Sequence, residues 1–325
     1  MNVAMENKRQ AVRQVVIDTG HEGQRVDNYL LACLKGVPKS RIYRLLRKGE
    51  VRVNKGRIKP SYRLKSGDIV RIPPIITNLR QISAPSAQLA DVILKSILFE
   101  DENLLILNKP PGIAVHGGSG INIGVIEALR ALRTDIPDLA LVHRLDRATS
   151  GCLIFAKNRE TLLELHKLLR TNEVDKRYVV LLKGEWRYGE HRVDMPLSKN
   201  RMQSGERMVC SDAGGKTATS HFRPVKINST ASLMEVKLIT GRMHQIRVHA
   251  AQKGYPVVGD DKYGDRAFNR EMRKFGLSRL FLHAHIIEFK LKGKDQKIIV
   301  KAPLPEDLGD CLGKLKLSDG RIQEF

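Results

Sequence analysis

The stretch LVHRLDRATSG, residues 141–151, places one histidine, two arginines and one aspartate between apolar flanks. The segments LVHRLD and GCLIFAK have the short apolar runs of strands, so Asp146 is expected close to the end of a buried strand. An aspartate in such a place is often only a turn former or a helix cap. Arg144 and Arg147 flank it, however, and a nearby cation favours an ionised carboxylate. Asp146 is therefore a candidate functional residue.

The segments around this stretch mix strand and helix patterns. Strands are predicted within 97–118 and at KRYVVLLKGE (176–185), TATSHFRPVKI (217–227), SLMEVKLIT (232–240) and HIIEFKLKG (285–293), and helices at VIEALRALR (125–133), ETLLELHKLLR (160–170) and MHQIRVHAAQKG (243–254). Strand-rich segments with few regular strand–helix–strand units indicate a mixed α+β domain with largely antiparallel pairing.

Two glycine-rich segments are weak candidates for nucleotide loops. GGSGINIG (117–124) has its glycines spaced GxGxxxG and lacks an acidic partner at the distance that a dinucleotide site requires. GGKT (214–217) lacks the first glycine of a phosphate loop, because Cys210 occupies that position. Neither segment predicts a nucleotide cofactor.

Spacing also disfavours metal and hydrolytic centres. His244 and His249 are five residues apart on one predicted helix, whereas a helical metal pair prefers four, and no carboxylate pattern completes a site. His143, Asp146 and Ser150 share one segment without a GxSxG elbow, whereas triad residues converge from separate elements. The four cysteines are far apart and form no CxxC pair. We therefore expect neither a bound metal nor a disulfide framework.

The N-terminal part of the chain predicts a separate small module. The first helix is indicated by apolar residues at helical spacing, which are Val26, Tyr29, Leu30, Cys33 and Leu34, and it ends near Gly36 and Pro38. Ser40 is expected to cap a second helix that Gly49 closes. That helix has an apolar face (Ile42, Leu45 and Leu46) and a basic face (Arg41, Arg44, Arg47 and Lys48). Three strands are predicted after it, at EVRVN (50–54), RIKPSYRL (57–64) and IVRI (69–72).

This order of two helices followed by strands resembles the S4 RNA-binding domain, especially in VPKSRIYRLLRKGEVRVN (37–54). A DNA-binding helix-turn-helix is the alternative, but the strands have no role in that motif. The predicted domains are an S4-like domain at 20–72, a linker at 73–90 and a larger α+β domain at 91–325.

Charge points to a polyanionic partner. The chain has 57 Lys and Arg against 35 Asp and Glu, a formal net charge of +22. Residues 23–72 contain 14 Lys and Arg and three Asp and Glu, which is a net +11. Such clustering is typical of nucleic-acid binding. No apolar signal core and no run of 18 apolar residues is present, so we expect a cytoplasmic location without a membrane partner.

Four motifs together resemble the RluA-type family of RNA pseudouridine synthases. They are LNKPPGIAVHGG (107–118), HRLDRATSG (143–151), KRYVVLL (176–182) and LITGRMHQIRVHAAQKGYPVVGDDKYG (238–264). With the S4-like front, the resemblance covers roughly residues 20–315. It implies conversion of selected uridines in large-subunit (23S) rRNA to pseudouridine, with that rRNA or an assembly intermediate of the subunit as partner, no cofactor, and a monomeric enzyme.

The same resemblance implies residue roles. Asp146 is the expected catalytic residue, Tyr178 lies against the target base, and Arg247 pairs with the aspartate. Arg144 is expected to hold a flipped-out nucleotide. Further RNA contacts are expected at Arg147, Thr149, Arg242, His244 and Gln245, and at the basic helix residues Arg41, Arg44, Arg47 and Lys48.

The chemistry is consistent with these residue types. Pseudouridylation breaks the bond from N1 of uracil to C1′ of ribose and rejoins the base through C5, so nothing is oxidised or hydrolysed overall. One ionised carboxylate can act as the nucleophile, or stabilise cationic character at C1′, and can take up the C5 proton. Flipping the nucleotide costs a few kcal/mol, which basic and aromatic contacts offset.

Two other functions stay open at this point. A non-catalytic ribosome-assembly factor on the same scaffold would bind RNA without turnover. A uracil-RNA glycosidase would release free uracil and leave an abasic ribose.

Overall fold

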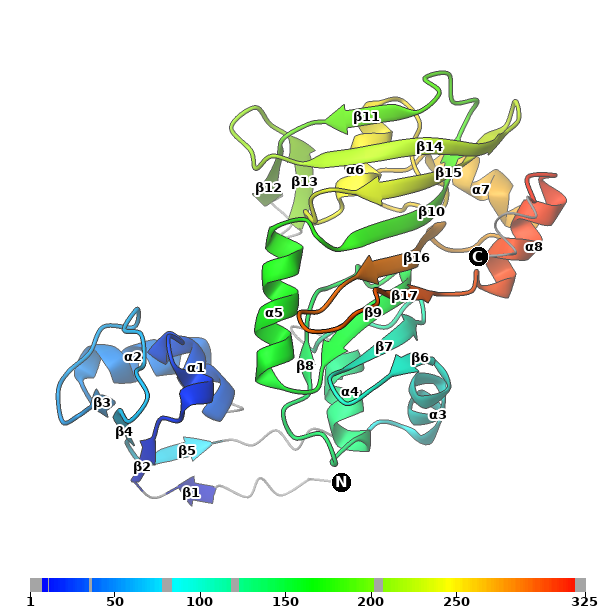
Figure 1. The fold of residues 1–325 in the computed structure, drawn as a ribbon. Helices are drawn as coiled ribbons and strands as arrows, with labels where there is room; N and C mark the ends of the chain where they lie inside the picture. The colour runs from blue at the N-terminus through cyan, green and yellow to red at the C-terminus, as the bar shows by residue number, and fades with distance from the viewer. Residues whose placement is uncertain are drawn as a thin grey trace, which may run out of the picture. The chain divides into compact units, whose positions relative to one another are not determined.

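The computed structural model describes residues 8–10, 12–34, 37–77, 84–117, 123–201 and 207–318 of the chain. The chain divides into two compact units, Met1–Ser83 and Ala84–Phe325 (Figure 1). This division lies inside the predicted linker 73–90, but β5 (Ile75–Thr77) and the start of α3 (Ala87–Lys95) also occupy that segment. They form there because Ile75 is buried in the core of the small unit, and because Ser86 caps α3 by accepting a hydrogen bond from the Leu89 N–H.

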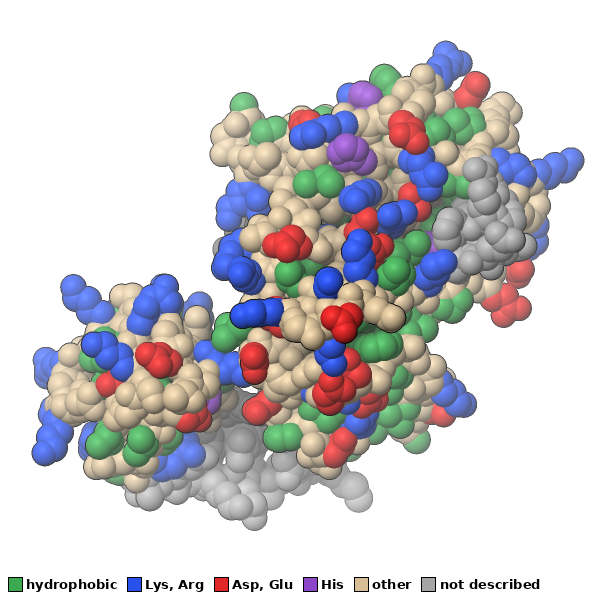
Figure 2. Space-filling view, in the orientation of Figure 1, with side chains coloured by type: hydrophobic (Ala, Val, Ile, Leu, Met, Phe, Trp, Pro, Cys, Tyr) green, Lys and Arg blue, Asp and Glu red, His purple; other side chains and the backbone are tan. Residues whose placement is uncertain are grey.

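The small unit contains the two predicted helices, α1 (Val26–Cys33) and α2 (Lys39–Lys48), and both are confirmed. They pack on a three-stranded antiparallel sheet in the order β2 (Arg13–Val16), β4 (Ile69–Ile72), β3 (Arg52–Val53). Ile42, Leu45 and Leu46 of α2 are buried in its core. Arg44, Arg47 and Lys48 are exposed and Arg41 is half-buried, so α2 has the predicted basic face. On the face visible in Figure 2, Lys and Arg side chains outnumber Asp and Glu on this unit.

The remaining elements of this unit are β1 (Lys8–Gln10), which pairs with β5, and a short 3-10 helix at Thr19–His21. The strand β2 and this short helix lie partly before residue 20, where the S4-like domain was predicted to begin. The pattern of β2 does not alternate, because the strand is exposed along most of its length.

Three local predictions for the small unit were wrong. Ser40 lies inside α2, because Pro38 takes the N-cap position with a backbone angle that suits a helix start. Cys33 is exposed. It is the last residue of α1, and the next residue, Leu34, is buried in the core in its place. The segment 57–64 is not a strand, since its carbonyl groups at Pro60 and Tyr62 accept hydrogen bonds from the first N–H groups of α1.

The large unit is built on a ten-stranded sheet in the order β11-β14-β15-β10-β16-β9-β7-β6, with β17 paired to β16 and β8 paired to β9. The strands are β6 (Ile97–Glu100), β7 (Leu104–Lys109), β8 (Ala140–Leu141), β9 (Ser150–Ala156), β10 (Asp175–Lys183), β11 (His191–Asp194), β14 (Thr219–Ile227), β15 (Ala231–Leu238), β16 (Leu282–Phe289) and β17 (Ile298–Lys301). Only the pair β9 and β16 is parallel among these strands. The predicted α+β class with largely antiparallel pairing is confirmed.

Besides α3, the helices in the described part of the large unit are α4 (Val125–Leu132), α5 (Arg159–Arg170), α6 (Gln245–Gln252), α7 (Arg266–Met272), a 3-10 turn at Arg273–Phe275 and α8 (Glu306–Lys314). In Figure 1, α6 lies behind β14 and β15, and α5 stands beside β8 and β9. A separate hairpin of β12 (Leu197–Arg201) and β13 (Arg207–Ser211) contacts α6. No helix within the described ranges is both long enough and apolar enough to cross a bilayer.

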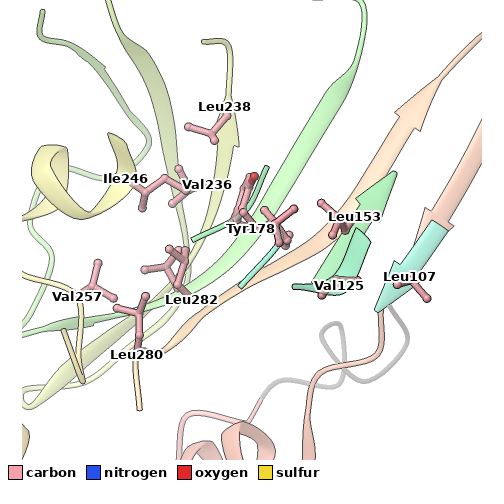
Figure 3. Close-up of a cluster of buried hydrophobic side chains, with 14 of the residues drawn as sticks. Leu107, Val125, Leu153, Tyr178, Val236, Leu238, Ile246, Val257, Leu280 and Leu282 are labelled. Carbon is pink, nitrogen blue, oxygen red and sulfur yellow. The ribbon is translucent and has the colours of Figure 1, made fainter. Parts of the chain in front are cut away.

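The main core of the large unit joins both halves of the sheet. Figure 3 shows Leu107 and Leu153 on one side of it and Val236, Ile246 and Leu282 on the other. Tyr178 of β10 lies in the middle of the same cluster, among packed apolar side chains.

The segment LVHRLD was predicted as a strand, and the structure corrects this. Only Ala140 and Leu141 form strand β8. The Val142 N–H still donates to the Ile154 carbonyl. The Ile154 N–H, however, donates to a side-chain atom, Nε2 of His143 (3.1 Å), and not to a backbone carbonyl of this segment. The ladder therefore ends at residue 142, and residues 142–149 form a loop.

Candidate active site

Asp146 lies in the loop that connects β8 to β9. The Thr149 N–H donates to the Asp146 carbonyl (3.1 Å), so the backbone of Asp146 does form a turn. Its carboxylate takes no part in that turn and is 20% exposed in the wall of a pocket. The turn-forming role therefore belongs to the backbone, and the side chain is available for chemistry.

The motif NKPPG (108–112) holds this loop through hydrogen bonds to the Arg147 carbonyl. Nζ of Lys109 donates to the carbonyls of Pro110 (2.7 Å), Ile113 (3.0 Å) and Arg147 (3.2 Å), and the Lys109 side chain is fully buried. Burial lowers the pKa of Lys109 to about 7, and the Asp146 carboxylate acts against this. Gly112 adds a backbone hydrogen bond to the Arg147 carbonyl (2.8 Å). Two motifs that are about 35 residues apart in the chain are thus locked together beside Asp146.

The residues after Asp146 fix the loop from the other end. Gly151 has a φ of +110°, and a Cβ at this position would lie 2.2 Å from the Ala284 carbonyl oxygen of β16, so only glycine fits. Oγ of Ser150 is buried and lies 2.9 Å from Nδ1 of His283. Nη1 of Arg279 also donates to this oxygen (3.3 Å), so the Ser150 hydroxyl is paired with β16 and Arg279.

The pocket has a volume of about 570 Å³ and lies between this loop, β10, the hairpin β12–β13 and the start of α6. It is lined by eight of the predicted site residues: Arg144, Asp146, Thr149, Tyr178, Arg242, His244, Gln245 and Arg247. Arg147 is exposed but does not line the pocket, because its Nε donates to the Gly112 carbonyl (2.7 Å). The four basic residues predicted on α2 belong to the small unit.

Asp146 and Arg247 meet in the wall of the pocket, although 101 positions separate them in the chain. Nη1 of Arg247 donates to Oδ2 of Asp146 (3.2 Å), while Nε and Nη2 donate to the two carboxylate oxygens of Asp260 (2.7 Å each). Burial would lower the pKa of Arg247, but the hydrogen bonds and charge of Asp260 raise it above its ordinary value. Arg247 is therefore a fixed cation beside Asp146.

Asp260 is a site residue that sequence reasoning missed. It is 1% exposed, and its Oδ1 also accepts hydrogen bonds from the backbone N–H groups of Lys262 and Tyr263. Burial would raise the pKa of Asp260, but the contacts with Arg247 lower it. The motif at 238–264 contains two adjacent aspartates, Asp260 and Asp261. They are distinguished by burial, because Asp260 is buried and Asp261 is exposed.

Tyr178 lines the pocket from β10, where its Cα partners are Val236 and Ala284. Burial and the nearby charge of Asp146 raise the pKa of Tyr178, so its side chain stays a neutral phenol at physiological pH. Tyr178 is therefore a neutral aromatic residue that belongs to the main core and also lines the pocket.

Gln245 and Thr149 are buried, and their contacts are internal. The Gln245 amide donates to the Thr219 carbonyl and to Oγ of Ser220, and its oxygen accepts from the Arg242 N–H and the Thr240 hydroxyl. Gln245 therefore holds the turn that precedes α6. Arg144 and Arg242 are exposed at the pocket, where cationic side chains can reach a polyanion.

The segment GGKT also lies at the pocket, although sequence reasoning set it aside. Gly214, Gly215 and Lys216 line it, and a Cβ on Gly215 would lie 2.6 Å from the Leu197 backbone. The sequence of GGKT does not reveal this position, because the close approach of Gly215 to Leu197 is a tertiary contact. In the described part of the chain, no three His, Cys, Asp or Glu residues converge as a metal site would require.

Comparisons with known proteins agree with both resemblances. Residues 103–252 match the model of the RNA pseudouridylate synthase family, and residues 24–70 match the S4 domain. The chain is 50% identical over 320 residues to ribosomal large subunit pseudouridine synthase C of Pasteurella multocida (strain Pm70), and the match covers 97% of this chain and 98% of the relative. It is 48% identical over 316 residues to the protein of the same name from Escherichia coli (strain K12), covering 96% and 99%.

Solved structures share the fold over about two thirds of the chain or more. Human RNA pseudouridylate synthase domain containing 4 matches with a TM-score of 0.60 and 25% identity, over 71% of this chain and 97% of that one. Human RNA pseudouridylate synthase domain containing 1 matches with a TM-score of 0.55 and 23% identity, over 66% and 86%.

Proposed function

The chain belongs to the RNA pseudouridylate synthase family, and we propose that it converts uridines of large-subunit (23S) ribosomal RNA to pseudouridine. The observation that carries the catalytic part is the ion pair of Asp146 and Arg247 in the pocket wall beside Tyr178. The relatives of similar length that bear a large-subunit name support the choice of RNA.

In this proposal the Asp146 carboxylate lies against C1′ of a flipped-out uridine. It stabilises the positive charge that develops there as the bond to N1 breaks. The uracil stays in the pocket, turns, and forms a new bond from C5 to C1′. Asp146 accepts the proton that C5 loses, and N1 gains one, so the product is an isomer of the substrate and no cofactor is consumed.

Other residues hold the participants in place. Arg247 keeps Asp146 oriented, because it donates to the Asp146 carboxylate and is itself a buried cation fixed by Asp260. Tyr178 stacks against the uracil, which offsets part of the cost of leaving the RNA stack. Arg144 and Arg242 bind phosphates of the flipped nucleotide and its neighbours, and Arg147 and His244 contribute charge and a hydrogen-bonding ring nearby. Thr149 and Gln245 shape the pocket through their internal hydrogen bonds.

The test is direct mapping of pseudouridine. Full-length protein would be incubated with 23S and 16S rRNA transcripts, and modified uridines would be located by primer extension after carbodiimide treatment. We expect new stops in 23S rRNA alone. Release of free uracil would identify a glycosidase instead, and RNA binding without either product would identify an assembly factor.

The small unit supplies RNA affinity in this proposal, through Arg41, Arg44, Arg47 and Lys48 of α2. Replacing exposed Arg44, Arg47 and Lys48 by alanine should weaken RNA binding. The plot of log association constant against log salt concentration should become less steep by about 2 to 3, because each lost phosphate contact means that about one counterion fewer is released on binding. Filter binding at several salt concentrations measures the slope. The exposed set Lys290, Lys292 and Lys294 provides a control with the same change in charge. Equal slopes for the two triple variants would refute the role of α2.

We also propose that the enzyme is a cytoplasmic monomer that acts on free 23S rRNA or on an assembly intermediate of the subunit. The basic composition and the names of the relatives support this setting. Light scattering of the purified chain would measure its mass, and a dimer mass would contradict the monomer.

A further inference from the structure

Tyr263 makes three contacts with residues of the pocket, and the proposed chemistry gives these contacts no role. Its hydroxyl oxygen accepts a hydrogen bond from the Val209 N–H of β13 (2.9 Å). The same oxygen lies 2.9 Å from Nδ1 of His244, the residue before α6. Its ring lies under the Arg247 guanidinium, 5.1 Å from the ring centre to the Arg247 Cζ. One half-buried side chain thus links the hairpin β12–β13, His244 and the cation that pairs with Asp146.

The hydrogen bonds of Tyr263 bear on which ring nitrogen of His244 carries the proton. A tyrosine hydroxyl has one proton to donate. The Val209 N–H is itself a donor, so of these two partners of the hydroxyl only Nδ1 of His244 can accept its proton. Burial raises the pKa of Tyr263, so the proton is present, and burial lowers the pKa of His244, so the imidazole is neutral. A neutral imidazole that accepts at Nδ1 has its proton on Nε2.

That proton faces the reacting carboxylate. Nε2 of His244 lies 3.7 Å from Oδ2 of Asp146, the oxygen that also accepts from Arg247. This distance is too long for a hydrogen bond, but hydrogen bonds of catalytic groups commonly shorten when substrate binds. His244 has a backbone φ of +53°, which is rare outside glycine and holds the ring at the start of α6. A second donor on Oδ2 would leave Oδ1 of Asp146 free for the ribose.

We propose that Tyr263 is a positioning residue that acts through His244: it docks the hairpin β12–β13 and holds His244 as an Nε2–H donor to Asp146. The kinetic part of this inference rests on the proposed function, whereas the tautomer of His244 does not. The hairpin contributes Leu197, Ser198 and Val209 to the pocket, so one hydroxyl group contacts both the hairpin and the histidine beside Asp146.

The first test measures the tautomer in the free, full-length protein. Histidine labelled with ¹⁵N would be observed by NMR, with His244→Gln used to assign the signal. We expect an unprotonated Nδ1 and a protonated Nε2, and a shift toward the other tautomer in Tyr263→Phe, which lacks the hydroxyl proton. A protonated Nδ1 in the unmodified protein would overturn the proposal, whatever the protein does to RNA.

The second test is a kinetic cycle on 23S rRNA. Tyr263→Phe should lower kcat by about tenfold, the effect of one hydrogen bond that favours the transition state. In a His244→Gln background, the same change should lower kcat by less than about twofold, because the path through the imidazole is already absent. Tyr255→Phe is the matched control, since Tyr255 packs on Trp186 outside the pocket and should keep full activity.

Equal losses from Tyr263→Phe in both backgrounds would mean that Tyr263 only supports the fold, and the proposal would be wrong. An unchanged kcat in Tyr263→Phe would also refute it. If the unmodified protein makes no pseudouridine, the proposed function fails while the NMR measurement still decides the role of Tyr263 toward His244.

Discussion

Asp146→Asn is expected to lower kcat for pseudouridine formation by on the order of 10⁴-fold or more, because the amide neither stabilises a cation at C1′ nor accepts the C5 proton. The fold should be unaffected. The Asp146 side chain is partly exposed, and Arg247 keeps its two hydrogen bonds to Asp260 when the carboxylate is lost. RNA affinity should stay within about threefold, since the phosphate contacts come from other side chains.

Single-turnover assays with tritium at C5 of uridine measure this loss, because that tritium is released when C5 forms its new bond. Asp138→Asn is a matched control, since Asp138 is exposed in the same unit and does not line the pocket. Tritium release by Asp146→Asn within tenfold of the unmodified rate would remove Asp146 from the catalytic role.

Asp260→Asn is expected to have the second largest effect, on both activity and stability. Arg247 and two backbone N–H groups donate to both carboxylate oxygens of Asp260, whereas asparagine offers one oxygen acceptor. The buried Arg247 guanidinium therefore loses one hydrogen bond and the negative charge that neutralises it. Removing one partner of a buried pair costs about 3–5 kcal/mol of unfolding free energy. The pair is 0% and 7% exposed, so solvent cannot replace the lost carboxylate.

Activity should fall by about 100-fold in this variant, because a small displacement of Arg247 also displaces Asp146. Urea denaturation and the tritium assay below the unfolding transition measure the two effects separately. Asp261→Asn tests the neighbouring carboxyl, which is exposed, and should change neither quantity. An Asp260→Asn variant with unchanged unfolding midpoint and a kcat within threefold would contradict the role of Asp260 as the anchor of Arg247.

The periodic parts of the fold could be predicted from the sequence. The helix α2 follows from Ile42, Leu45 and Leu46 at helical spacing, and Gly49 ends it in the left-handed conformation that favours glycine. The long buried strands β9, β10 and β15 follow from continuous apolar runs. The short elements β2, β11, α7 and α8 were missed, because their patterns are too brief or too polar to differ from loops.

The LVHRLD segment shows why local patterns fail near the site. Its apolar residues favour a strand, but the His143 ring replaces a backbone acceptor for Ile154 and ends the ladder. A side chain from within the segment thus competes with the strand, which no periodicity reveals. The loop that results is the one that carries Asp146.

The sequence by itself determined the basic charge, the two-part organisation, the α+β class and the candidate Asp146, because composition, periodicity and motif spacing are properties of neighbouring residues. Only the tertiary structure decided that Asp260, Lys109 and Tyr263 serve the same site. Their polar atoms act through contacts with residues that are distant in the chain, as in the hydrogen bond from Lys109 to the Arg147 carbonyl. Such contacts form when the sheet brings separate segments together and burial leaves each polar group dependent on the partner it meets there.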